Sequence, residues 1–164
     1  MQQWDFTANS ETDTDRLGLA LADRLPETVT VALQGTLGAG KTRLVQALAA
    51  ACGIDGHSVT SPTFVLCQPY QGTRQIYHLD AYRVGDLDEF LELGVEEYFE
   101  GPGVTLIEWA DRIAPCLPVD YLEIDIEILG EQQRQFQITA HGCELEAALE
   151  LIATDLQGNP TSEA

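Results

Sequence analysis

GTLGAGKT, residues 35–42, matches the pattern G-x-x-x-x-G-K-[ST] of a phosphate-binding P-loop. The run before it, TVTVALQ (residues 28–34), is apolar and rich in β-branched residues, as expected of a buried strand. The run after it, RLVQALAAAC (residues 43–52), combines good helix formers with apolar residues at helical spacing. A P-loop requires this order of strand, loop and helix. The flanks therefore argue against a glycine-rich turn that merely precedes an ordinary helix.

The residue types in this stretch suit phosphate binding. Gly35, Gly38 and Gly40 let the backbone curl so that successive N–H groups and the following helix N-terminus face phosphate oxygens. Lys41 is the only lysine in the chain, beside seven arginines, and it occupies the position where an ammonium neutralises phosphate charge. The Thr42 hydroxyl is expected to bind Mg²⁺. The predicted nucleotide-binding residues are Gly35, Leu37, Gly38, Ala39, Gly40, Lys41, Thr42 and Arg43.

Length and composition favour a single globular unit. The 164 residues, 45% of them apolar, suit one domain, which we place at residues 1–155, followed by a flexible tail at residues 156–164. No run is apolar enough to cross a membrane, and the polar, acidic N-terminus does not read as a signal or transit peptide. The four cysteines form no CxxC pair, which disfavours a zinc site or disulfide framework and predicts a cytoplasmic chain with reduced thiols.

The formal net charge of −19 restricts the possible partners. Nucleic-acid-binding proteins displace counterions with basic residues, and eight lysines and arginines spread along the chain cannot easily build such a surface. We therefore expect a solvated acidic surface, or docking to a basic partner. In the most acidic segment, residues 86–100, the carboxylates are expected on the wet face of a short helix that is broken or capped at Gly94.

Two later strands are expected to bring carboxylates toward the P-loop. Alternation in RQIYHLDAYR (residues 74–83) places His78 and Asp80 on one face of a strand. Asp80 could position water or hold a metal, or it could be ion-paired or cap a helix; His78 alone reads more simply as a structural histidine. VTLIEW (residues 104–109) has the form of a Walker B strand, in which Glu108 would serve Mg²⁺.

The loop beyond the P-loop helix has features of a switch. In HSVTSPTF (residues 57–64), Ser61, Pro62 and Thr63 combine two hydroxyls with a stiffening proline. Loops at this point of P-loop proteins often face the γ-phosphate and Mg²⁺ and change order with nucleotide state. A polar connector is the alternative interpretation.

The order of elements predicts an α/β fold, a three-layer P-loop NTPase-like domain with a mixed, mainly parallel central sheet and an antiparallel edge hairpin. Residues 64–70 and 74–82 read as two strands joined by a short turn. Residues 121–128 and 134–140 alternate strictly and are expected to pair antiparallel at a sheet edge. A last helix is expected over residues 144–154.

The combination of motifs resembles one family. GTLGAGKT, SPTF, HLDAYR, LDEFLELGVEEYF and IEWADRI occur in an order and spacing similar to those of the TsaE family, the bacterial P-loop ATPases of the threonylcarbamoyladenosine tRNA-modification pathway. The similarity extends from about Val31 to Ile128, and the tail beyond about Thr154 lies outside it.

The resemblance implies a protein that binds ATP and Mg²⁺ and works with TsaD and TsaB, which modify the adenosine next to the anticodon of ANN-reading tRNAs. Hydrolysis, weak in the isolated protein, would support turnover of the TsaD–TsaB complex, and tRNA would be met only through that complex. Lys41 and Thr42 carry over as phosphate and Mg²⁺ contacts. The expected catalytic residues are Asp80, Glu108 and Thr63, with Thr42 and Glu108 at the metal. The expected switch or partner residues are Ser61, Pro62, His78, Tyr82, Arg83 and Trp109.

Two other functions share the P-loop. A small-molecule kinase could use Asp80 and Arg83 on a hydroxyl substrate, although such enzymes usually close several arginines over the phosphates and none cluster here. A GTPase switch usually needs an NKxD element for guanine. With Asn9 and Asn159 the only asparagines and Lys41 the only lysine, the chain has no such element.

Overall fold

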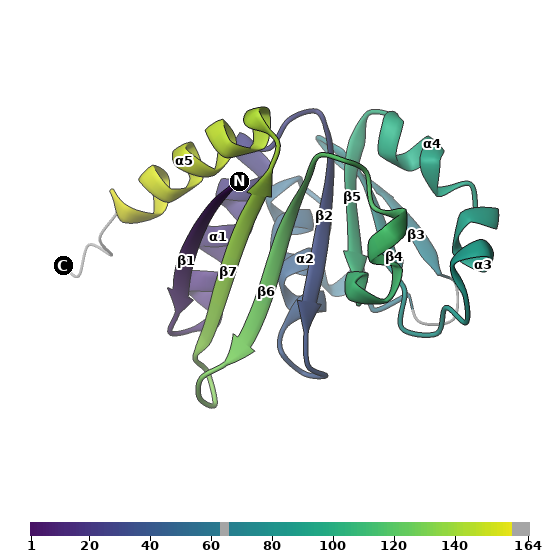
Figure 1. Cartoon of the computed structure of the whole chain (residues 1–164). Helices are drawn as coiled ribbons and strands as arrows, with labels where there is room; N and C mark the ends of the chain where they lie inside the picture. The colour runs from purple at the N-terminus through teal and green to yellow at the C-terminus, as the bar shows by residue number, and fades with distance from the viewer. Residues whose placement is uncertain (63–65, 159–164) are drawn as a thin grey trace.

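The computed structural model describes residues 1–62 and 66–158 and contains a seven-stranded sheet with helices on both faces (Figure 1). The strands are β1 (Gln2–Ala8), β2 (Thr28–Gly35), β3 (Cys67–Gln71), β4 (Gln75–Asp80), β5 (Gly103–Glu108), β6 (Tyr121–Ile128) and β7 (Arg134–His141). The α-helices are α1 (Glu11–Arg24), α2 (Lys41–Ala51), α3 (Leu87–Glu92), α4 (Val95–Glu100) and α5 (Cys143–Gln157). Two 3-10 helices are η1 (Gly56–Ser58) and η2 (Ala110–Cys116).

The strand order β1-β7-β6-β2-β5-β4-β3 places the P-loop strand β2 near the middle of the sheet. The four central strands β6, β2, β5 and β4 run parallel. Their carboxyl ends therefore meet at one edge of the sheet, which is where open α/β sheets bind ligands. The predicted mixed α/β fold is confirmed.

Antiparallel pairs flank the parallel centre on both sides. The hairpin β3–β4, predicted as two strands joined by a short turn, forms one edge of the sheet. The hairpin β6–β7, which the sequence places at an edge, lies inside the sheet, so that expectation is wrong. The reason is that β1 pairs antiparallel with β7 along its whole length, from Gln2 to Ala8, while β6 pairs with β2. The N-terminal strand thus covers the hairpin that local alternation left unpartnered.

Two apolar cores, one on each face of the sheet, account for the three layers. On one face, α1, α2 and α5 bury side chains such as Leu17, Leu48 and Leu149 against the sheet. On the other face, Phe90 of α3 and Ile113 of η2 pack over β2, β4 and β5. Burial of such side chains is the main driving force for folding. The first core fixes α2, and with it the P-loop, on the sheet.

The helices α1 and α2 approach each other closely at Gly18. A Cβ atom at this position would lie 2.6 Å from the Ala47 Cβ and 2.8 Å from the Leu48 backbone nitrogen, so only glycine fits. The α1 helix begins after Ser10, whose hydroxyl accepts a hydrogen bond from the Asp13 N–H at 3.4 Å. This close packing holds the P-loop helix against α1 on the same face of the sheet.

Elsewhere the structure refines the predicted boundaries. The acidic segment forms two short helices, α3 and α4, of six residues each. They are separated at Gly94, which has the left-handed conformation that favours glycine. Helix α5 continues to Gln157, beyond the expected end at Thr154, and residues 159–164 of the expected tail lie outside the described residues. Within the described part of the chain, no helix combines the length and apolar character needed to cross a membrane.

Candidate functional site

The P-loop backbone turns between the end of β2 and the start of α2. Gly35 has φ +145°, and a Cβ atom there would lie 2.7 Å from the Ile126 carbonyl oxygen and 3.1 Å from the Ala39 Cβ. Gly38 and Gly40 also have positive φ, at +80° and +113°, with no atom near the position of a Cβ. Gly35 is thus required for both conformation and space, whereas Gly38 and Gly40 are required for conformation alone.

Lys41 lies at the centre of the site and is only 5% exposed. Its ammonium donates hydrogen bonds to the carbonyl oxygens of Gly35 at 2.7 Å and Thr36 at 3.0 Å. It also lies 3.9 Å from the centroid of the Trp109 ring. Burial lowers the pKa of Lys41, and the negative charge of Glu108 opposes that shift.

Strand β5 brings Glu108 to the start of α2. The Thr42 hydroxyl lies 3.0 and 2.9 Å from the two carboxylate oxygens of Glu108, which is 3% exposed. The same carboxylate contacts His78 of β4, whose Nε2 lies 2.6 Å from Oε2. Two oxygen groups that could bind a metal ion, a hydroxyl and a carboxylate, therefore face each other at the carboxyl ends of parallel strands.

Asp80 ends β4 beside Glu108. The two residues are Cα partners in the parallel pairing of β4 and β5, so their side chains start on the same face of the sheet. The Asp80 carboxylate accepts hydrogen bonds from the Ser61 hydroxyl at 2.8 Å and from the Tyr82 N–H at 2.8 Å. Ser61 comes from the loop expected to act as a switch, and its hydroxyl contacts the acid of the HLDAYR motif.

These side chains line one open cleft of about 390 Å³ beside the P-loop. Its lining residues are Leu37, Gly38, Gly40, Lys41, Thr42, Arg43, Ser61, Asp80, Tyr82, Glu108 and Trp109. Among the other predicted site residues, Pro62 and His78 are buried and Arg83 is exposed, and none of the three is among the described residues that line the cleft. Thr63 lies outside the described residues.

An aromatic pair forms one wall of the cleft. Trp109 follows Glu108 with left-handed backbone angles, φ 59° and ψ 38°, which are uncommon for a residue other than glycine. Its ring lies 5.0 Å from that of Tyr82, measured between centroids. The Arg112 guanidinium carbon lies 4.9 Å from the centroid of Tyr82 and 6.0 Å from that of Trp109. Sequence reasoning did not single out Arg112, because only the turn after β5 brings it to this wall.

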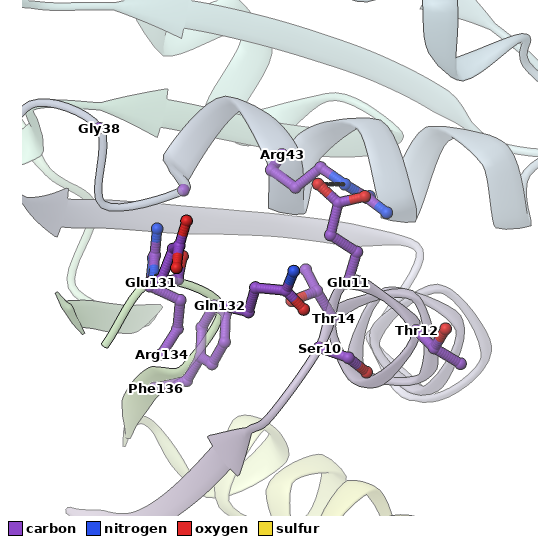
Figure 2. Close-up of a pocket in the computed structure, with 11 residues that line it drawn as sticks. Ser10, Glu11, Thr12, Thr14, Gly38, Arg43, Glu131, Gln132, Arg134 and Phe136 are labelled. Carbon is purple, nitrogen blue, oxygen red and sulfur yellow. Dashed lines mark hydrogen bonds and ion pairs between the residues drawn. The ribbon is translucent and has the colours of Figure 1, made fainter. Parts of the chain in front are cut away.

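A second hollow, of about 380 Å³, lies on the other side of the P-loop (Figure 2). Gly38, Gly40 and Arg43 line both the cleft and this hollow. The rest of its lining comes from the start of α1 and from the β6–β7 hairpin, namely Ser10, Glu11, Thr12, Thr14, Glu131, Gln132, Arg134 and Phe136. Figure 2 shows Arg43 and Glu11 projecting toward each other across one side of it.

Arg134 connects the hairpin to the P-loop. Its Nε donates a hydrogen bond to the Ala39 carbonyl at 3.0 Å, and Nη1 donates to the Gly130 carbonyl at 2.7 Å. Sequence reasoning missed this residue. Its only signal in the sequence is that it is basic in a strongly acidic chain, because its partner in the P-loop, Ala39, is distant in the sequence.

Comparison with known proteins agrees with this geometry. A family model described as "Threonylcarbamoyl adenosine biosynthesis protein TsaE" matches residues 8–136. A relative from Nostoc sp., named tRNA threonylcarbamoyladenosine biosynthesis protein TsaE, is 39% identical over 154 residues, covering 91% of this chain and 91% of its own. The protein of the same name from Treponema pallidum is 39% identical over 131 residues, covering 80% of this chain and 96% of its own.

The fold is also found among solved structures. The crystal structure of YdiB from Bacillus subtilis superposes with a TM-score of 0.78 at 31% sequence identity, covering 93% of this chain and 95% of that one. The matched region of the family model includes the P-loop, Asp80 and Glu108 and extends into β7. The chain therefore belongs to the TsaE family of tRNA threonylcarbamoyladenosine biosynthesis proteins.

Proposed function

We propose that this protein is a Mg²⁺-dependent ATPase that hydrolyses ATP to support turnover of the TsaD–TsaB complex in tRNA threonylcarbamoyladenosine synthesis. The observation that carries the proposal is the convergence of Lys41, Thr42, Asp80 and Glu108 on one cleft at the carboxyl ends of parallel strands. The Lys41 ammonium and the backbone N–H groups of the loop can bind phosphate oxygens, and the oxygens of Thr42 and Glu108 can bind a metal ion.

The donor set fits Mg²⁺. Mg²⁺ prefers oxygen ligands and usually keeps several waters while taking one or two protein groups and substrate phosphates. The Thr42 hydroxyl and the Glu108 carboxylate supply two such oxygens, and they already face each other at hydrogen-bond distance. Among the described residues, no group of three or more His, Cys, Asp or Glu side chains could hold a metal ion. Phosphate oxygens and water would complete the shell. When bound there, Mg²⁺ would neutralise charge that develops on the phosphates.

Asp80 is the acid best placed to orient water. Its carboxylate ends β4 at the cleft, next in register to Glu108 but without a direct bond to Thr42 among the contacts of the described residues. Ser61 and the Tyr82 N–H hold it by two hydrogen bonds. A carboxylate fixed in this way can accept a hydrogen bond from an attacking water, as water-positioning residues do in other phosphoryl-transfer enzymes.

The second hollow provides a place for the base of the nucleotide. It shares Gly38, Gly40 and Arg43 with the cleft, so a ligand with its phosphates at the P-loop can extend into it. Glu131 and Gln132 offer groups that can hydrogen-bond a base edge, and the buried ring of Phe136 lies beneath them in the core (Figure 2).

The acidic surface fits a subunit that works through protein partners. With a net charge of −19, this chain repels a nucleic-acid backbone, and a basic protein surface complements it. We therefore infer that tRNA is reached through the TsaD–TsaB complex, in the cytoplasm, and that the isolated chain hydrolyses ATP slowly because partner groups complete the site.

The deciding experiment measures phosphate release from ATP and Mg²⁺ by the purified chain, alone and with TsaD and TsaB. We expect slow release alone and a marked rise with both partners, lost in Lys41→Ala. Arg24→Ala is the matched control, since Arg24 pairs with Asp155 outside the cleft. No rise on adding the partners would contradict the coupling. Transfer of phosphate to a nucleoside or sugar in place of water would show a kinase instead.

A further inference from the structure

His78 is a buried polar side chain that the proposed hydrolysis leaves without a task. It is 0% exposed on β4, and its Nε2 lies 2.6 Å from Oε2 of Glu108. The other ring nitrogen, Nδ1, is buried and has no hydrogen-bond partner among the described residues. Buried polar groups usually have a hydrogen-bond partner. Among the described residues this ring has one, Glu108, and we infer that this contact sets its orientation.

We propose that His78 is a positioning residue that holds the Glu108 carboxylate in the orientation in which it meets Thr42. This inference rests on the proposed function, because it assigns a task to a neighbour of the metal-binding acid. The contact is diagonal: the Cα partner of His78 in β5 is Leu106, whereas that of Glu108 in β4 is Asp80. The hydrogen bond therefore holds Glu108 to His78 instead of to its own register partner.

The proton on the ring must lie on Nε2. A bare Nε2 would place a lone pair 2.6 Å from a carboxylate oxygen and an unpaired N–H at the buried Nδ1, and both are unfavourable. With the proton on Nε2, the ring donates to Glu108, and only an acceptor stays unpaired at Nδ1. The direction of the hydrogen bond is thus fixed by its surroundings.

Holding Glu108 in this way separates two neighbouring acids. Glu108 accepts hydrogen bonds from His78 and Thr42, while Asp80 accepts from Ser61 and the Tyr82 N–H. Each carboxylate therefore has its own donors. Without the His78 donor, Glu108 can rotate, and the pair of oxygens that faces the metal is no longer preformed. Residues that orient a metal ligand typically change metal affinity by about 10- to 100-fold when replaced.

The test uses two substitutions with different donors. His78→Leu removes the donor, whereas His78→Gln keeps a side-chain N–H of similar reach. The readout is binding of a non-hydrolysable ATP analogue, titrated at increasing Mg²⁺. We expect His78→Leu to raise the Mg²⁺ concentration for half-maximal binding about tenfold or more. His78→Gln should recover most of that loss, and binding without Mg²⁺ should change little. In a Glu108→Gln background, His78→Leu should have no further effect.

An unchanged Mg²⁺ requirement in a folded His78→Leu protein would overturn the proposal. An equal loss of binding with and without Mg²⁺ would do so too, since it would indicate a general packing role. A second test uses the wild-type protein and so does not depend on whether the variants fold. Long-range ¹H–¹⁵N NMR shows which ring nitrogen of His78 carries the proton. A proton on Nε2 supports the inference, and a proton only on Nδ1 contradicts it. Failure of the wild type to bind nucleotide would instead reject the proposed function. The NMR result would still test whether His78 donates a hydrogen bond to Glu108.

Discussion

The Lys41 ammonium lies 3.9 Å from the centre of the Trp109 ring while it donates to two carbonyl oxygens of its own loop. The group expected to meet phosphate is thus occupied by partners from the protein itself. A phosphate has to compete with the carbonyls of Gly35 and Thr36, and this competition offers several ways to test the site.

The first prediction concerns tryptophan fluorescence. Binding of an ATP analogue should move the Lys41 ammonium relative to the Trp109 ring, which changes the electrostatic environment of the indole. A titration should therefore show a saturable change in emission. The change should persist in Trp4→Phe, because Trp4 lies on β1, and it should vanish in Trp109→Phe. A signal that depended on Trp4 would contradict the proposed position of the phosphates.

The second prediction concerns pH. Burial lowers the pKa of Lys41, so this side chain loses its proton at a lower pH than an ordinary lysine. Only the charged form attracts phosphate, and bound phosphate in turn raises the pKa. Nucleotide affinity should therefore be constant while Lys41 is protonated and fall as the pH rises through its pKa in the free protein. Calorimetric titrations from neutral to alkaline pH measure this fall.

Lys41→Arg is the comparison for the pH experiment, since a guanidinium keeps its charge throughout this range. Its affinity is expected to be lower at neutral pH, because the fork of the guanidinium does not match the position of the ammonium. The alkaline decline should be absent. A decline of equal size in both proteins would assign the pH dependence to another group.

The third prediction compares two glycines of the P-loop. Gly35→Ala places a methyl group 2.7 Å from the Ile126 carbonyl oxygen, whereas Gly38→Ala meets no atom within 4 Å. Both substitutions carry the conformational cost of a positive φ, about 1–2 kcal/mol. Gly35→Ala adds a steric cost of about 1–3 kcal/mol. Urea unfolding should show the larger loss of stability for Gly35→Ala, and equal losses would argue against the tight approach of β2 to β6.

The fourth prediction concerns the two acids. Asp80→Ala and Glu108→Ala should each lower the rate of ATP hydrolysis about 100-fold or more, because water and metal lose their partners. Thermal melting should stay close to that of the wild type. Asp125→Ala is the control, since Asp125 is an exposed acid of β6 outside the lining of the cleft. Normal turnover in either variant would remove that acid from the mechanism.

The fifth prediction concerns Arg134. Arg134→Ala removes the hydrogen bonds to the Ala39 and Gly130 carbonyls, so the P-loop loses its connection to the β6–β7 hairpin. Nucleotide affinity should fall about tenfold, since a charged hydrogen bond contributes about 1.5–3 kcal/mol. Isothermal titration with an ATP analogue measures this change. If Arg134→Ala lowered the affinity for inorganic phosphate analogues alone and left the affinity for ATP unchanged, that result would contradict a role beside the second hollow.

The sequence was most informative where chemistry depends on spacing. The positions of Lys41 and Thr42 follow from one motif, and alternation within a strand correctly placed His78 and Asp80 on one face. Contacts between distant segments could not be predicted in this way. The diagonal bond from His78 to Glu108 depends on the register of two strands, and the bond from Arg134 to Ala39 depends on how a hairpin folds over a loop.

The position of the β6–β7 hairpin shows the same limit. Its alternating residues are equally compatible with an edge and with an inner position, because side-chain alternation reports the faces of a strand and not its neighbours. The pairing of β7 with β1 joins residues at opposite ends of the chain, for example Trp4 with Ile138. Local sequence contains no information on such a pairing.

The absence of a side chain at Gly18 has a mechanical consequence. Because the backbones of α1 and α2 touch there, neither helix can slide or rotate past the other without opening the core. We therefore expect the P-loop helix to stay in place during the proposed hydrolysis of ATP. Under that proposal, rearrangements between nucleotide states are expected in the loop that carries Ser61 and in the segments that follow β4 and β5, which carry Tyr82, Trp109 and Arg112 beside the cleft.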